Sequence, residues 1–153
     1  MSSPQSLNVF KQPLRFFSAD PLTGYFRDGY CRTTAPVSTS TGRAGLAVDP
    51  GNHAVAAVVT DEFLDYSASR GNDLRAGKGL RGGCRWCLCS ARWLEAYRAY
   101  RGGRIGMLGV PRVDLDATEE SALGTVDLQT LRQFAVREPD GEGSGNGSGN
   151  GAA

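Results

Sequence analysis

The chain is poor in several features, and each shortage excludes a class of protein. It has a single histidine, His53, and no apolar run that approaches the roughly 18 residues of a membrane span. The N-terminal segment "MSSPQSLNVF" lacks a basic stretch followed by an apolar run, so we expect no export signal and a soluble, cytoplasmic protein without membrane contact. The net charge of +1 makes nucleic acid an unfavourable partner.

Positive charge is nevertheless concentrated in one part of the chain. Between Arg70 and Arg104 lie eight arginines and one lysine, against two acidic residues. Such a segment could hold an anion, although arginines on the exposed side of a helix are the favoured explanation. The glycine pattern "GKGLRG" in this segment precedes an expected strand and opens no helix, so it is no dinucleotide fingerprint, and no cofactor is expected.

The order of expected elements indicates an α+β fold. Strands are predicted over residues 53–60, 84–89 and 111–118, and Asp28-Gly29 is a hairpin signal. Helices are predicted over 61–70, capped by Thr60, and over 91–101, capped by Ser90; shorter ones follow Thr118 and Asp127. The strand over 84–89 is apolar on both faces, which favours a central position. We therefore expect one domain, a small sheet with helices packed on it in two layers.

Two segments are poor in core residues. Residues 33–52 are rich in Ser, Thr, Gly and Pro and are predicted to be a long surface loop within a single globular domain over residues 8–136. Residues 140–153 form a Gly/Ser/Asn-rich tail, for which we expect disorder.

The four cysteines are the first candidates for chemistry. In a cytoplasmic chain, Cys31, Cys84, Cys87 and Cys89 are expected to be free thiols or metal ligands rather than disulfides. Cys89 stands at the start of a predicted helix, where backbone N–H groups and nearby arginines would favour a thiolate nucleophile, with Cys87 beside it. The same four cysteines could bind zinc, and simple core packing is the third possibility.

Polar loop residues are the second group of candidates. His53 begins a strand and could reach Cys89 if their strands pair. Two turns would supply the rest of a pocket. The candidates for binding there are Asp20, Thr23, Arg27, Arg70 and Asn72, and those for proton transfer are Asp28 and Asp73.

Four motifs carry a resemblance to a known family. "DPLTGYFRDGYC", "TDEFLDYSASRGNDL", "RWCLCSARWLEA" and "LDATEESAL" resemble, in order and spacing, the family called domain of unknown function 2237, over roughly residues 8–136. The resemblance implies a compact α+β domain and no assigned activity. Cys31, Cys87, Cys89 and His53 match the family pattern, whereas Cys84 and Glu119 depart from it.

Three functions follow as hypotheses, and the sequence does not decide whether the protein is an enzyme. The first is a small-molecule-binding or thiol-using, enzyme-like domain with a polar pocket near the Cys-x-Cys strand. The second is a non-catalytic module that docks on a protein or nucleic acid through Trp86, Trp93 and an Arg-rich helix face. The third is a zinc-binding domain. Oligomeric state is not predicted.

Overall fold

A three-stranded antiparallel sheet lies at the centre of the structure, a computed structural model that describes residues 6–136. Its strands are β3 (Val55–Val58), β4 (Arg85–Leu88) and β5 (Arg112–Val113), in the order β4-β3-β5. The small and β-branched residues of β3 fit this buried position. The strand over 84–89, predicted to be central, instead lies at the edge of the sheet, because β3 pairs with both neighbours.

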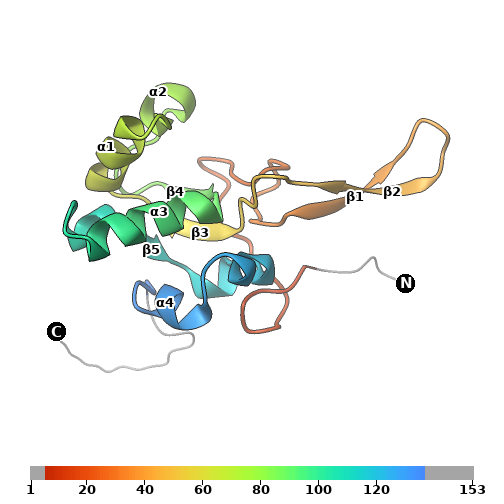
Figure 1. Ribbon diagram of the computed structural model, residues 1–153. Coiled ribbons are helices and arrows are strands. Elements are labelled where there is room, and N and C mark those ends of the chain that lie inside the picture. Colours follow the sequence, from red (N-terminus) through yellow and green to blue (C-terminus); the bar gives the residue numbers. More distant parts are fainter. Residues whose placement is uncertain (1–5, 137–153) are drawn as a thin grey trace.

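Helices cover the sheet and confirm the α+β prediction. They are α1 (Asp61–Ser69), α2 (Leu74–Lys78), α3 (Ser90–Arg101) and α4 (Leu128–Arg132). Thr60, Asp73 and Asp127 begin three of them by accepting the backbone N–H three residues on. Figure 1 shows α3 running along the sheet, with α1 and α2 toward one end and α4 on the other side.

The main core lies between the sheet and α3. Trp93, which is fully buried, stacks on Tyr97 and meets Phe134 edge-on, and its indole N–H donates to the carbonyl of Pro111. Trp86 and Leu88 join this core from one face of β4, whereas Cys87 packs on the other face with Cys31. The predicted alternation of side chains along β4 is therefore confirmed.

The segment from residue 107 onward consists mostly of single turns. Three 3₁₀ helices occur, η1 (Met107–Gly109), η2 (Leu115–Ala117) and η3 (Glu120–Gly124). The strand predicted over 111–118 therefore ends after Val113. Thr118 still connects to the sheet, because its hydroxyl accepts the backbone N–H of Ala56.

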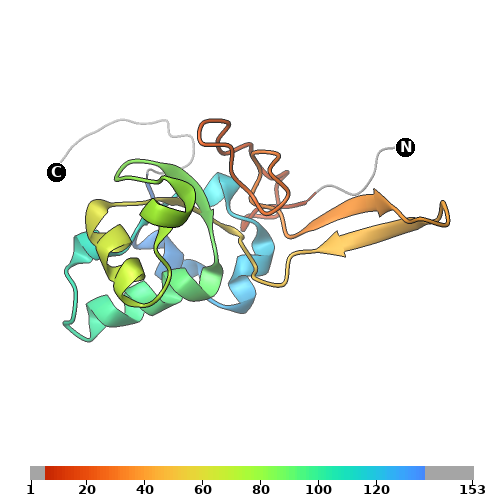
Figure 2. The same ribbon diagram turned by 90° about the horizontal axis from the view of Figure 1, so that it is seen from above.

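A β-hairpin replaces most of the loop that was predicted over residues 33–52. Its strands are β1 (Thr34–Ser38) and β2 (Ala44–Val48), paired in antiparallel register from Thr34–Val48 to Ser38–Ala44. Figures 1 and 2 both show this hairpin projecting away from the central sheet. The loop prediction is wrong here because small and polar residues can pair along a strand without contributing to the core.

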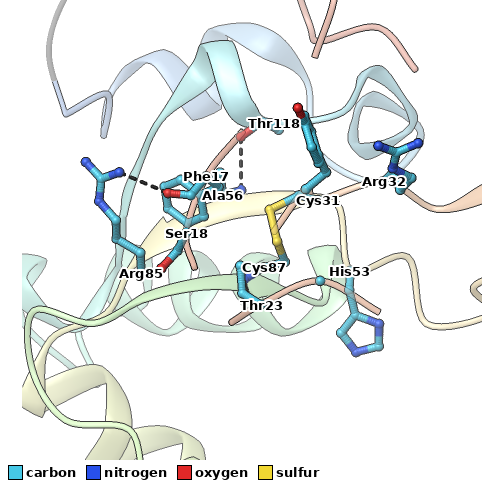
Figure 3. Close-up of a disulfide and its surroundings, with 12 residues drawn as sticks. Phe17, Ser18, Thr23, Cys31, Arg32, His53, Ala56, Arg85, Cys87 and Thr118 are labelled. Carbon is cyan, nitrogen blue, oxygen red and sulfur yellow. Dashed lines mark hydrogen bonds between the residues drawn. A yellow bond between two sulfur atoms is a disulfide. The ribbon is translucent and has the colours of Figure 1, made fainter. Parts of the chain in front are cut away.

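The chain before the hairpin has no regular helix or strand between residues 6 and 33. The hairpin predicted around Asp28-Gly29 is wrong, since Gly29 instead donates to Thr23 and accepts bonds from Phe17 and Ser18. A disulfide joins Cys31 of this coil to Cys87 of β4, with Cα atoms 5.2 Å apart (Figure 3). The expectation of free thiols or metal ligands rather than disulfides is therefore wrong for this pair; Cys84 and Cys89 remain unbonded.

Additional contacts attach the coil beside the disulfide. Arg85 Nη1 donates to the carbonyl of Phe17 over 3.1 Å, and the backbone N–H of Cys87 donates to the Thr23 hydroxyl over 2.8 Å. Cys31 and Phe17 are buried in a small cluster with Ala56 and Ala117. Figure 3 shows Phe17, Thr23 and Ala56 beside the two sulfur atoms. The coil is thus attached to β4 by one covalent bond, by these hydrogen bonds and by the burial of this apolar cluster.

We expect the disulfide to stabilise the fold substantially. Replacing Cys31 and Cys87 with alanine should lower the free energy of unfolding by roughly 2–4 kcal/mol, because the bond closes a long loop in the unfolded chain. The two residues are separated by 56 positions. Urea denaturation measures the change, and Cys84→Ala, which removes an unbonded thiol, is the control. Equal midpoints for the double variant and the wild type would contradict this role.

Candidate functional site

A cleft of about 350 Å³ opens beside β4 and the N-terminal coil. Three separate parts of the chain build it: the coil, the segment around α2, and the facing ends of β3 and β4. Its lining residues are Gly24, Tyr25, Arg27, His53, Asn72, Leu74, Lys78, Trp86, Cys87, Leu88 and Cys89. This set contains two cationic side chains and no carboxylate.

His53 is held in a defined orientation at the edge of the cleft. Its Nδ1 lies 2.9 Å from Oδ2 of Asp49, whose side chain is fully buried. Asp49 is itself fixed, because it accepts the backbone N–H groups of Gly51 and His53. A Cβ at position 51 would lie 2.5 Å from Cε1 of His53, so the ring position requires glycine there. Nδ1 is thus occupied, and Nε2 remains for other partners.

Arg27 forms the cationic wall of the cleft. Its backbone lies in the left-handed region, with φ of 54°, and its Nη1 donates to the carbonyl of Gly24. The guanidinium carbon lies 5.2 Å from the ring centroid of Trp86, a cation–π geometry. These contacts hold the guanidinium in place before any ligand arrives.

Cys89 supplies the free thiol of the cleft. It is half-buried and precedes the first turn of α3. The prediction that Ser90 caps this helix is wrong: Ser90 lies within α3, and its hydroxyl donates to Asn52. The antiparallel register Val55–Leu88 places Cys89 and His53 at the same end of the strand pair, as the sequence suggested.

Cys87 lines the cleft without a free thiol. Because its sulfur is bonded to Cys31, it holds no nucleophile in this state. The same bond removes two of the four candidate zinc ligands. Within residues 6–136, no group of three or more His, Cys, Asp or Glu side chains is placed to hold a metal ion.

Several other predicted residues lie outside the cleft. Asp28 pairs with Arg32, Asp73 caps α2, and Arg70 pairs with Glu95 on a different surface. Thr23 is buried and bonds to β4, and Asp20 is exposed beside Pro21. The structure therefore brings Arg27, Asn72, His53, Cys87 and Cys89 together from the predicted set and leaves the remaining five apart.

Sequence reasoning missed four contributors to the site. Asp49 was assigned to a loop, Tyr25 and Lys78 were given no role in binding, and Trp86 was assigned to a docking surface rather than to this pocket. The one available signal was the spacing of Asp49 from His53, four residues ahead of the single histidine. Tyr25 stacks on His53 with ring centroids 6.0 Å apart, a contact between distant segments that no local pattern predicts.

The expected exposed tryptophan pair is also absent. Trp93 is 0% and Trp86 is 8% exposed, so the docking surface predicted for an interaction module is wrong in this detail.

No helix in residues 6–136 is both long and apolar enough to cross a membrane. The tail over residues 140–153 lies outside the described residues.

The geometry predicts one tautomer for His53. At a pH where the ring is neutral, Nδ1 should carry the proton, because it faces the Asp49 carboxylate. Asp49→Ala should shift the population toward the Nε2–H tautomer. Nitrogen chemical shifts of the ring measure this directly, since no other histidine contributes signals. An unchanged tautomer in the variant would show that Asp49 does not orient the ring.

Comparison with known proteins agrees with the resemblance found in the motifs. Residues 7–135 match the family described as "Uncharacterized protein conserved in bacteria (DUF2237)". No curated protein matches the sequence. The matched range contains every helix and strand described above, together with the disulfide and the residues of the cleft. The chain therefore belongs to the DUF2237 family of conserved bacterial proteins.

Proposed function

We propose that the cleft beside β4 binds a small organic anion and presents the Cys89 thiol to it. The observation that supports this most is the composition of the wall: Arg27 and Lys78 are cationic, and no lining residue is acidic. An anionic group entering the cleft would meet attraction from both side chains and no opposing carboxylate. The volume of about 350 Å³ suits a small molecule rather than a polymer.

The remaining walls define what else the ligand would carry. Trp86, Leu74 and Leu88 offer apolar surface, and Asn72 offers an amide that can donate and accept. A ligand with a short apolar body and one carboxylate or phosphate would satisfy both kinds of wall. The guanidinium of Arg27, already fixed by Gly24 and Trp86, would bind the anion with little loss of side-chain freedom.

Cys89 and His53 supply the groups for a thiol-dependent reaction. In this proposal, Nε2 of His53 accepts the proton of the Cys89 thiol, and the thiolate adds to a carbonyl carbon of the bound molecule. The π electrons of the carbonyl move to its oxygen, which then takes the proton from His53. Asp49 keeps the imidazole oriented through its contact with Nδ1. If Cys89 contacts the ligand without attacking it, the cleft binds the anion and catalyses no reaction.

Alkylation rates at Cys89 test the charge of the cleft. Iodoacetate is anionic and iodoacetamide is neutral, and both alkylate thiolates. In Cys84→Ala protein, Cys89 should favour iodoacetate over iodoacetamide by roughly threefold to tenfold relative to a free thiol, because Arg27 and Lys78 raise the local anion concentration. Arg27→Ala should remove most of this preference while leaving the iodoacetamide rate nearly unchanged.

The second free cysteine provides a matched comparison. In Cys89→Ala protein, Cys84 packs against the main core rather than lining the cleft and should show no such preference. The proposal fails if Cys89 reacts only after denaturation, or if the two cysteines discriminate equally between the reagents. Mass spectrometry of the labelled peptides assigns each modification.

A further inference from the structure

We propose that the groove between α1 and α3 is a second binding site, for an organic anion that carries more than one negative charge and an apolar body. This cleft of about 530 Å³ shares no residue with the cleft at Cys89, and the inference does not depend on the function proposed for that site. Its lining residues are Tyr66, Ser69, Arg70, Ala91, Leu94, Glu95, Arg98 and Arg104. Figures 1 and 2 show the two helices side by side.

The side chains that line the groove carry a net positive charge, and ion pairs hold part of that charge in place. Glu95 is its one carboxylate, and it is already paired with Arg70 at 3.2 Å and with Arg92 at 3.1 Å. Arg92 also donates to the backbone carbonyl of Arg70, which links the end of α1 to α3. Glu95 therefore neutralises part of the arginine charge while holding Arg70 and Arg92 in fixed positions.

Two further arginines of the groove remain available for a ligand. Within the described part of the chain, Arg98 and Arg104 take part in no ion pair and no side-chain hydrogen bond. Arg104 lies close to the end of α3, since a Cβ at position 102 would lie 2.9 Å from its Nη1. Glycine at position 102 thus lets this guanidinium fold back over the end of α3, where the helix dipole favours a cation.

The apolar floor of the groove indicates that the ligand also carries an apolar body. Leu94 and Ala91 are apolar, and Tyr66 adds an aromatic ring with a hydroxyl. Two or three guanidinium groups above such a floor match carboxylates or phosphates attached to a hydrophobic or aromatic body. Inorganic anions alone would use the arginines and leave the floor unused, so the organic anion should bind more tightly.

Fluorescence titration with 1-anilinonaphthalene-8-sulfonate tests this site on the full chain. The probe combines an aromatic body for the apolar floor with one sulfonate for the arginines, and we expect saturable binding that pyrophosphate and citrate, which carry several negative charges, displace. Arg98→Ala and Arg104→Ala should each weaken probe binding by roughly tenfold, since each removes a charge-assisted hydrogen-bond donor. Both side chains are exposed, so we expect the variants to fold as the wild type does. Circular dichroism checks this.

Two control variants distinguish this groove from general attraction and from the other cleft. Arg101→Ala removes the same charge from an exposed position of α3 outside the groove and should leave binding unchanged. Arg27→Ala reports on any probe that enters the cleft at Cys89 and should weaken binding less than Arg98→Ala or Arg104→Ala; the opposite order would overturn the proposal. The proposal is overturned if the probe does not bind, if pyrophosphate and citrate leave it bound, or if Arg98→Ala and Arg104→Ala match Arg101→Ala.

Discussion

The covalent bond between Cys31 and Cys87 is the constraint on which the arrangement of the cleft depends. Residues 6–33 contain no helix or strand, so they gain little from cooperative backbone pairing. Ordering such a coil costs conformational entropy at every residue. The disulfide reduces that cost by restricting the unfolded chain, and the contacts of Phe17 and Thr23 with β4 then fix the path of the coil. Tyr25 and Arg27 reach the cleft because of this path.

The two cationic clefts are separated by a single turn of the chain. Arg70 belongs to the groove between α1 and α3, whereas Asn72, two residues later, lines the cleft at Cys89. The turn at Gly71 lies between these two residues. The buried hydroxyl of Ser67 lines neither cleft and donates a hydrogen bond to the carbonyl of Asn72. One short segment thus contributes polar groups to two surfaces, which explains why its sequence alone suggested a single pocket.

Elements with strong local signals were predictable, and elements without them were not. Thr60 and Asp127 cap helices where the sequence indicated, and the apolar run before Thr60 forms β3. The hairpin β1–β2 escaped prediction because its residues are mostly small, polar or exposed, so no alternation marks a buried face. Asp28-Gly29 gave a false hairpin signal because its neighbours use their backbone groups within the coil.

The cysteines show most clearly what sequence could and could not decide. Local patterning determined that Cys87 and Trp86 point to opposite faces of β4, that Cys89 lies at the start of a helix, and that His53 begins a neighbouring strand. Those properties depend on residues close together in the chain. Tertiary structure alone decided that Cys31 meets Cys87, that Tyr25 stacks on His53, and that Arg70 pairs with Glu95 outside the cleft. Each of these contacts requires the relative placement of separate segments, which packing of the whole chain sets and local sequence patterns do not.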